Sequence, residues 1–206
     1  FAALANSGSV PIVITTDLGN TLTINGYSGD AFGGSVSYSY ELLDNETHAS
    51  GAGENSLFDN LAVVVTDADG SIASDILSIR VVDDVPTAID DVGGTASESN
   101  LLVTGNVLTD GVDDVLGADG PAAGGAVTPA VLVGTYGTLT LLADGGYSYA
   151  LNTSDPDFIA LGGGGSASDV FNYTLTDGDG DSDTGQLTIN VLNENDGVII
   201  TGLTPA

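Results

Sequence analysis

Two copies of one sixteen-residue pattern lie 110 residues apart in this chain, and they constrain its fold more than any other feature. The copies are TDADGSIASDILSIRV at 66–81 and TDGDGDSDTGQLTINV at 176–191, with seven of the sixteen positions identical. Self-similarity at a fixed offset indicates repeated structural units. Each copy begins with carboxylates and glycines and ends in alternating apolar residues, so each predicts a turn that leads into a strand.

The residues just before each copy alternate as well. The apolar positions are Leu61, Val63 and Val65 in the first copy and Phe171, Tyr173 and Leu175 in the second. A period of two predicts a strand with one buried face, so strand, turn and strand together form a hairpin. We therefore predict an all-β chain in which each hairpin closes one antiparallel β-sandwich. The predicted domains are residues 1–84 and 85–196, with 197–206 as the start of a following repeat, and the first strands of the first domain are expected to be missing or differently arranged.

Composition supports many short strands and a core in each domain. Apolar residues make up 42% of the 206 residues, and 30 glycines accompany clustered Ser, Thr, Asp and Asn. No 3.6-residue periodicity is sustained, so no long helix is expected. The predicted strands are residues 10–15, 21–24, 34–43, 60–66, 76–82, 101–107, 131–133, 137–142, 146–151, 171–175 and 187–191. Polar loops are expected at residues 44–56 and 110–125, and a stiff link around Pro86 is expected between the domains.

The charge is extreme and one-sided. The chain has 29 Asp and Glu residues against a single basic residue, Arg80, and a net charge of −28. Such a chain is repelled by nucleic acid and by anionic membrane surfaces, so we expect neither as a partner. Bound divalent cations are one remedy for so much self-repulsion; the alternative is that the acids only keep the surface soluble. Cysteine is absent, which excludes disulfides.

The second copy of the repeat has the pattern of a calcium loop. Asp177, Asp179, Asp181 and Asp183 place a carboxylate at every second residue, with Gly178 and Gly180 between them. Calcium accepts six to eight oxygen ligands in loose geometry, whereas magnesium demands a tighter octahedron. The segment does not match an EF-hand, because Ser182 and Thr188 occupy the positions that require Gly and Glu. The alternative is an Asp/Gly turn with solvated carboxylates, an interpretation that is stronger for Asp67 and Asp69 in the first copy.

Chain direction predicts which acids meet. If the last strand of a sandwich exits at its C-terminal end, then the turn before that strand lies where the chain enters. Residues Asp177 to Asp183 should therefore lie beside the acids of the preceding link, which are Asp83, Asp84, Asp90 and Asp91. By the same logic Asp67 and Asp69 face an upstream domain. The acidic segment Asn193, Glu194, Asn195 and Asp196 is expected to complete a site with a downstream domain.

Several segments resemble one protein family. The segment TDGDGDSDTGQLTINVLNEND resembles the closing hairpin and calcium linker of cadherin-like repeats. The segments DVPTAIDD, TGNVLTD, GTLTLLADGGYSYAL and VFNYTLTDGDG, with YELLDNETHASGAGEN, VVVTDADG and VVDDVPTA in the first domain, are similar to VCBS-type and related cadherin-like repeats of large type I-secreted RTX adhesins. The resemblance implies tandem Ig-like or cadherin-like sandwiches, bound Ca²⁺ and export to the bacterial cell surface. The sequence Asn195-Asp196-Gly197 departs from the cadherin linker, which continues with Asn and Pro.

The expected function is mechanical. We expect a calcium-rigidified extender segment of a bacterial adhesin that acts in adhesion and biofilm formation, with neighbouring domains of the same long chain as partners. The alternative is a module of the same adhesin that binds a surface glycan or a protein through residues 44–56 or 110–125. Enzymatic activity is not expected, because His48 is the single histidine and lies in a polar loop without other signs of a catalytic site. No apolar run is long enough to insert into a membrane, and we expect an extracellular location.

Overall fold

The computed structural model describes residues 11–29, 33–51, 53–67 and 69–197, and the prediction of an all-β chain is confirmed for them. Within these residues the elements are strands and one short helix, α1 (Pro156–Ala160). The chain divides into two compact units. The first comprises residues 1–49 and 54–83, and the second comprises residues 50–53 and 84–206. The expected start of a third repeat at 197–206 lies, apart from Gly197, outside the described residues.

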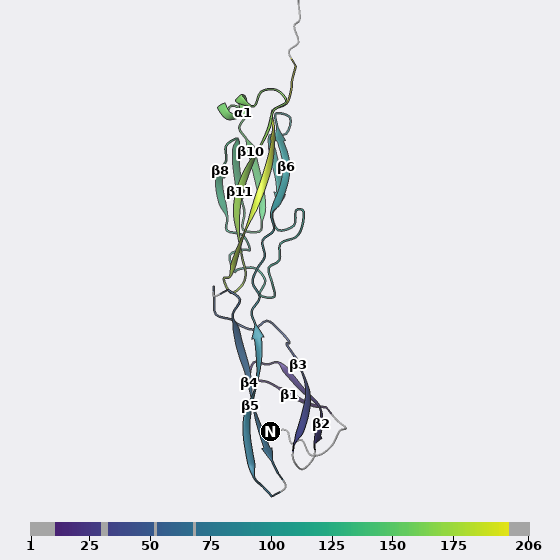
Figure 1. Cartoon of the computed structure of the whole chain (residues 1–206). Coiled ribbons are helices and arrows are strands. Elements are labelled where there is room, and N and C mark those ends of the chain that lie inside the picture. Colours follow the sequence, from purple (N-terminus) through teal and green to yellow (C-terminus); the bar gives the residue numbers. More distant parts are fainter. Residues whose placement is uncertain (1–10, 30–32, 52, 68, 198–206) are drawn as a thin grey trace, which may run out of the picture. The chain divides into compact units, whose positions relative to one another are not determined.

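The second unit is built from two facing β-sheets (Figure 1). One sheet has four antiparallel strands in the order β7 (Leu102–Asn106), β10 (Gly146–Leu151), β9 (Gly137–Leu141) and β8 (Ala130–Val133). The other has the order β11 (Ser166–Thr176), β12 (Ser182–Leu192) and β6 (Asp91–Ser97). The pairing of β12 with β6 is parallel, and Leu187 lies opposite Asp91. The chain therefore enters this sheet at the end where the β11–β12 turn lies, as the sequence predicted.

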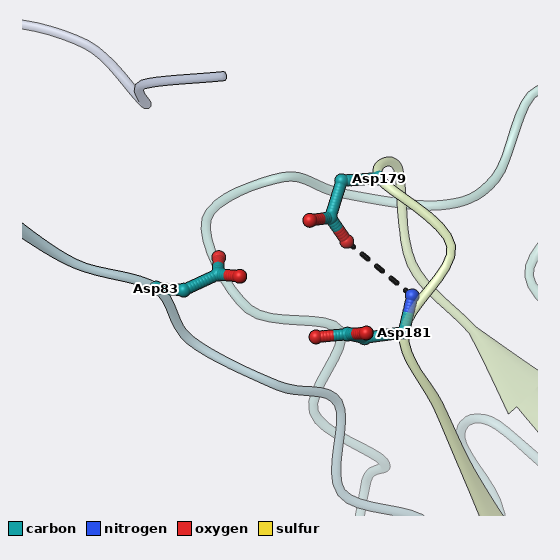
Figure 2. A group of neighbouring side chains, drawn as sticks. All are labelled: Asp83, Asp179 and Asp181. Atoms are coloured by element: carbon teal, nitrogen blue, oxygen red, sulfur yellow. Dashed lines mark hydrogen bonds between the residues drawn. The ribbon is translucent and has the colours of Figure 1, made fainter. Parts of the chain in front are cut away.

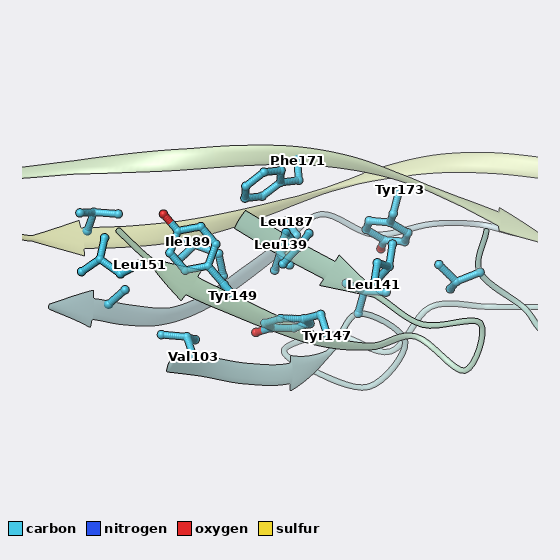
Figure 3. Packing of buried hydrophobic residues seen from close by; sticks show 14 of the residues in the cluster. Val103, Leu139, Leu141, Tyr147, Tyr149, Leu151, Phe171, Tyr173, Leu187 and Ile189 are labelled. Atoms are coloured by element: carbon cyan, nitrogen blue, oxygen red, sulfur yellow. The ribbon is translucent and has the colours of Figure 1, made fainter. Parts of the chain in front are cut away.

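Period-two alternation creates the core of the second unit. In β11 and β12 every second side chain is buried from Asp169 to Leu175 and from Gly185 to Val191. Figure 3 shows these side chains facing those of β9 and β10, which alternate in the same way. The rings of Tyr149 and Phe171 meet across the sandwich with centroids 6.0 Å apart. Burial of so many large apolar groups is the main stabilising contribution to this unit.

The long segment between β7 and β8 is fastened to β11. The backbone amide of Ala122 donates to Thr176 O at 3.2 Å, and that of Thr176 donates to Ala126 O at 2.8 Å. Isolated bridges also pair Pro121 with Asp177 and Val127 with Leu175. These bonds satisfy backbone groups that an irregular segment leaves open. As a result, residues 121–128 are held beside the end of β11 that leads into the β11–β12 turn.

The first unit contains a three-stranded sheet and a separate hairpin. The sheet has the order β1 (Ile12–Thr15), β2 (Thr21–Gly29) and β3 (Gly34–Glu41), and the hairpin is β4 (Ser56–Thr66) with β5 (Ile72–Val82). Tyr40 in β3 donates its hydroxyl to the buried Asp59 in β4 at 2.8 Å. β2, β4 and β5 are longer than the strands predicted from the sequence, whereas β1 begins later and β3 ends earlier than predicted.

Two expectations for the first unit are wrong. Among its described residues, Leu22 and Val81 are the buried apolar side chains, so the expected core is not formed there. The predicted buried face of β4 is also not observed, because Val63 is 41% and Val65 62% exposed. The run Val63–Val64–Val65 is apolar on both faces of the strand, so the sequence does not distinguish an inner face from an outer one. That the first unit is a sandwich of the same kind as the second stays a prediction.

Candidate metal centre

The β11–β12 turn is organised by the first carboxylate of the repeat. Asp177 Oδ1 accepts hydrogen bonds from the backbone amides of Gly180 at 3.1 Å and Asp181 at 2.8 Å. Gly180 has φ of +104°, a conformation that a side chain disfavours, so the turn requires glycine there. Figure 2 shows the Asp179 and Asp181 side chains on this turn, with the 3.3 Å bond from the Asp181 amide to Asp179 Oδ1 dashed.

Asp119, from the segment that follows β7, joins this turn. One carboxylate oxygen from each of Asp119, Asp177 and Asp179 lies within 4.8 Å of the others, a spacing at which one cation can contact all three. The segments approach closely here, because a Cβ atom added to Gly178 would lie 2.5 Å from the Asp119 carbonyl oxygen. Gly178 therefore permits Asp119 to reach the group.

Asp84 extends the group toward the entry of the chain. Its Oδ2 accepts a hydrogen bond from the Ala118 amide at 2.6 Å, and a carboxylate oxygen of Asp84 lies within 4.8 Å of one from Asp119. We refer to Asp84, Asp119, Asp177, Asp179 and Asp181 as the turn cluster. All five residues belong to the second unit.

The short segment of residues 50–53 also belongs to the second unit and contacts the turn cluster. Ser50 Oγ donates to the Asp179 carbonyl oxygen, and the Gly53 amide donates to Asp181 Oδ1 at 2.8 Å. These bonds fix the backbone of the turn and one oxygen of Asp181. The second oxygen of that carboxylate stays available for another ligand.

The turn cluster has the electrostatics of a cation site. Asp179 Oδ2 and Asp181 Oδ2 are buried and accept no hydrogen bond within the described residues. Burial and, to a smaller extent, the neighbouring Asp179 together raise the pKa of Asp177 to about 6. Residues 84–206 contain no Lys, Arg or His, so no side chain of that stretch can neutralise the charge. Carboxylate oxygens at this spacing, two of which accept no hydrogen bond, are suitable ligands for a hard divalent cation such as Ca²⁺.

Other predicted ligands of the second unit have different partners. Asp183 Oδ2 accepts from the Ala88 amide at 2.9 Å, and Asp90 Oδ1 accepts from the Gln186 amide at 2.9 Å. These two bonds fasten the entering chain to β12. Asp91 is buried at the start of β6.

Asp67 and Asp69, the acids predicted at the hairpin turn of the first unit, form no such group among its described residues. Asp67 Oδ1 caps the β4–β5 turn by accepting from the Asp69 amide at 3.2 Å and the Ser71 amide at 2.8 Å, and both acids are exposed. Asp83, the last residue of the first unit, is buried and accepts from Asn55 Nδ2 at 2.7 Å.

The acidic segment after β12 is engaged in local bonds. Asn193 Nδ2 donates to Phe158 O at 3.1 Å. Glu194 Oε1 accepts from the hydroxyls of Ser99 and Ser97, which hold the pKa of Glu194 below its usual value. Asn195 and Asp196 are exposed. Whether this segment binds an ion with a further domain stays a prediction.

The structure adds Asp119 to the residues predicted from sequence. It lies in the sequence GADG, and an Asp-Gly pair in a loop was a visible signal of a tight turn. Its approach to Asp177 depends on the path of the long segment along β11, which no periodic pattern encodes.

The second unit is a β-sandwich domain with a cluster of acids at one end whose spacing suits a metal ion. Residues 83–193 match the family model of the bacterial cadherin-like domain. This match covers more than half of the chain, and the chain belongs to that family. Cadherin-like domains are typically structural and adhesive modules rather than enzymes, and they generally bind Ca²⁺. No curated protein matches the chain, and among the described residues no helix is long and apolar enough to cross a membrane.

Proposed function

We propose that this chain is a calcium-stabilised extender segment of a large bacterial surface adhesin of the RTX type, exported by type I secretion and acting in adhesion and biofilm formation. The observation that supports this proposal best is the turn cluster, where acids from three separate segments converge and two buried oxygens lack hydrogen-bond donors. In the absence of a cation, these carboxylates repel one another in a partly desolvated place. A divalent ion offsets that repulsion and links the segments that supply the ligands.

The proposed role of calcium is to fix the entering chain to the sandwich. Asp84 follows directly after the first unit, so an ion bound to Asp84, Asp119 and the turn holds the start of the second unit in place. Asp83 is one peptide bond away from Asp84, and we include it as a proposed ligand. Neighbouring domains of the same chain are the proposed partners, and restricted motion at such links is the proposed source of stiffness.

A ligand-binding role for residues 110–125 has less support. In this segment Leu116 packs against the core, and Ala122 is hydrogen-bonded to the backbone of β11. The segment thus contributes to the sandwich and to the turn cluster. Recognition of a glycan or a peptide stays an alternative without a specific observation in its favour.

Calorimetric titration of the full chain with Ca²⁺ tests the proposal. The variants Asp179→Asn and Asp181→Asn remove ligand charge at the turn cluster and should lose one bound ion or weaken it at least tenfold. The matched control is Asp113→Asn, which removes one charge from an exposed position in the segment between β7 and β8. Equal binding by all four proteins would contradict a role for the turn cluster.

A further inference from the structure

Five strands of the first unit repeat five strands of the second in the same order. The sheet β1–β2–β3 corresponds to β8–β9–β10, and the hairpin β4–β5 corresponds to β11–β12. The sequence TLT occurs in both β2 and β9, and YSY occurs in both β3 and β10. One contact is repeated as well. The hydroxyl of Tyr40 donates to Asp59 at 2.8 Å, and at equivalent positions of the second unit Tyr149 donates to Asp169 at 2.7 Å.

Two strands of the second unit have no counterpart among the described residues of the first. β6 lies parallel to β12, and β7 lies antiparallel to β10. The equivalent edges belong to β5 and β3, and in the described part of the first unit neither edge is paired with a further strand. β6 and β7 together span residues 91–106, so the ten residues ahead of Pro11 are too few to supply both.

A tyrosine that β6 and β7 cover in the second unit is exposed in the first. Tyr147 in β10 is 5% exposed, whereas Tyr38, at the equivalent position of β3, is 44% exposed. Cβ atoms added to Gly93 in β6 and Gly105 in β7 would lie 2.7 and 2.5 Å from the Tyr147 hydroxyl, so both strands approach this side chain closely. The first unit therefore presents apolar surface at the position that such strands would cover.

A backbone amide at the open edge of β5 has a substitute acceptor. In the second unit the amide of Gln186 in β12 donates at 2.9 Å to Asp90, which directly precedes β6. At the equivalent position of β5, the amide of Ile76 donates at 2.8 Å to the carboxylate of Asp75, the residue before it. The local bond thus takes the place of the bond that the entering strand supplies in the second unit.

We infer that the first unit binds a strand pair with the pattern of residues 90–106, one strand parallel to β5 and the other antiparallel to β3. Addition of strands to open sheet edges is a general mode of recognition. The chemistry of the partner follows from the contacts in the second unit. It carries an acid that accepts from the Ile76 amide in place of Asp75, and glycines in both strands that leave room for Tyr38.

The source of the strand pair is the polypeptide that precedes the first unit in the same long chain. In the second unit β6 and β7 precede β8, the first of the five shared strands. A covalent link also gives strands from the same chain a high effective concentration. This choice of source rests on the proposed function, in which neighbouring parts of one long chain are the partners.

A synthetic peptide of residues 88–107 tests the open edge of β5 in the full chain. The chain has no cysteine, so a single one can be placed at the exposed Ser78. Thr188, at the equivalent position of β12, lies opposite Val92 in β6. The peptide with Val92→Cys should therefore form a disulfide with the Ser78→Cys chain. The control chain Asp113→Cys should give at least tenfold less product. Equal yields from both chains, or no product from either, overturn the inference.

A chimera tests the source of the strands. In it, a copy of residues 88–128 replaces the residues ahead of Pro11, because Pro11 and Pro129 directly precede β1 and β8. Binding of anilinonaphthalene sulfonate, a dye that reports exposed apolar surface, should fall at least threefold relative to the parent chain. A control chimera with Gly93→Leu and Gly105→Leu in the added copy should keep the parental dye binding, because these side chains have no room beside the tyrosine.

The outcomes separate this inference from the proposed function. If the peptide cross-links but the first chimera keeps the parental dye binding, then the strands come from another molecule and the proposed source is wrong. Neither assay measures calcium binding, so a failure of both would overturn the strand pair and leave the calorimetric titration to decide the role of the turn cluster.

Discussion

Asp169 in β11 provides the sharpest test of how the second unit uses a buried carboxylate without a metal. The side chain is 3% exposed, yet it accepts three hydrogen bonds. The donors are the Thr135 amide at 2.7 Å, the Tyr136 amide at 3.0 Å and the Tyr149 hydroxyl at 2.7 Å. These bonds join β11 of one sheet to the β8–β9 turn and β10 of the other.

Replacement of Asp169 by Ala should destabilise the second unit strongly. It leaves three donors without an acceptor and removes a buried charge whose partners remain, for which losses of about 3–5 kcal/mol are typical. A sandwich of about 110 residues has an unfolding entropy of roughly 0.23 kcal/mol/K, so the melting temperature should fall by about 13–22 °C. Tyr149→Phe, which removes a single donor, should cost about 1–3 kcal/mol.

Differential scanning calorimetry in calcium and in chelator measures this effect. The Asp169→Ala shift should be the same in both conditions, because Asp169 accepts three hydrogen bonds from protein donors and lies outside the turn cluster. The exposed substitution Asp113→Ala should change stability by less than about 0.5 kcal/mol. A shift below about 1 kcal/mol for Asp169→Ala, or one seen only in calcium, would refute this reasoning.

Two further predictions concern buried acids of the second unit. Gly178→Ala places a methyl group against the Asp119 carbonyl oxygen, so it should weaken calcium binding at least tenfold in a titration. The circular dichroism spectrum should stay that of wild type. Unchanged calcium affinity would contradict the role of this close approach. In the folded state, burial raises the pKa of Asp91 and Asp177 to about 6, above the ordinary Asp value of 3.8. In chelator, the contribution of these two groups to the free energy of unfolding should therefore be fully present below pH 3.8 and should be lost as the pH rises through about 6. Melting curves recorded from pH 4 to 8 check this, and Asp91→Asn should flatten the dependence; a calcium-free protein that gains stability over this range would contradict the assigned pKa shifts.

The sequence predicted the second unit well because its strands alternate cleanly. Phe171, Tyr173 and Leu175 are the residues expected on the buried face, and the structure buries them. It did not reveal β6, where Gly93 and Gly94 give no strand signal. A Cβ atom at Gly93 would lie 2.7 Å from the Tyr147 hydroxyl, so a side chain there would disturb the core. Tertiary packing overrides local propensity at this position.

The candidate sites were predictable only where chain direction determines proximity. Because the closing hairpin turns at the end of the sandwich where the chain enters, the sequence predicts that Asp84 and Asp90 lie at the same end as Asp177. From the sequence, Asp110, Asp114 and Asp119 are parts of a polar loop. Their positions in the fold depend on backbone hydrogen bonds along β11 and on hydrogen bonds from tyrosine hydroxyls. Such contacts follow no sequence period, so a structure was needed to place these acids.

The central claim is that calcium stabilises this cadherin-like chain through its buried carboxylates, and thermal unfolding in calcium, magnesium and chelator tests it most directly. If a site binds with a Kd of about 10⁻⁴ to 10⁻³ M, then 10 mM Ca²⁺ adds about 1.4–2.7 kcal/mol, or about 6–12 °C for the second unit. Equal magnesium should give a much smaller rise, because it needs a tighter octahedron. Equal melting temperatures in calcium and in chelator would contradict the account.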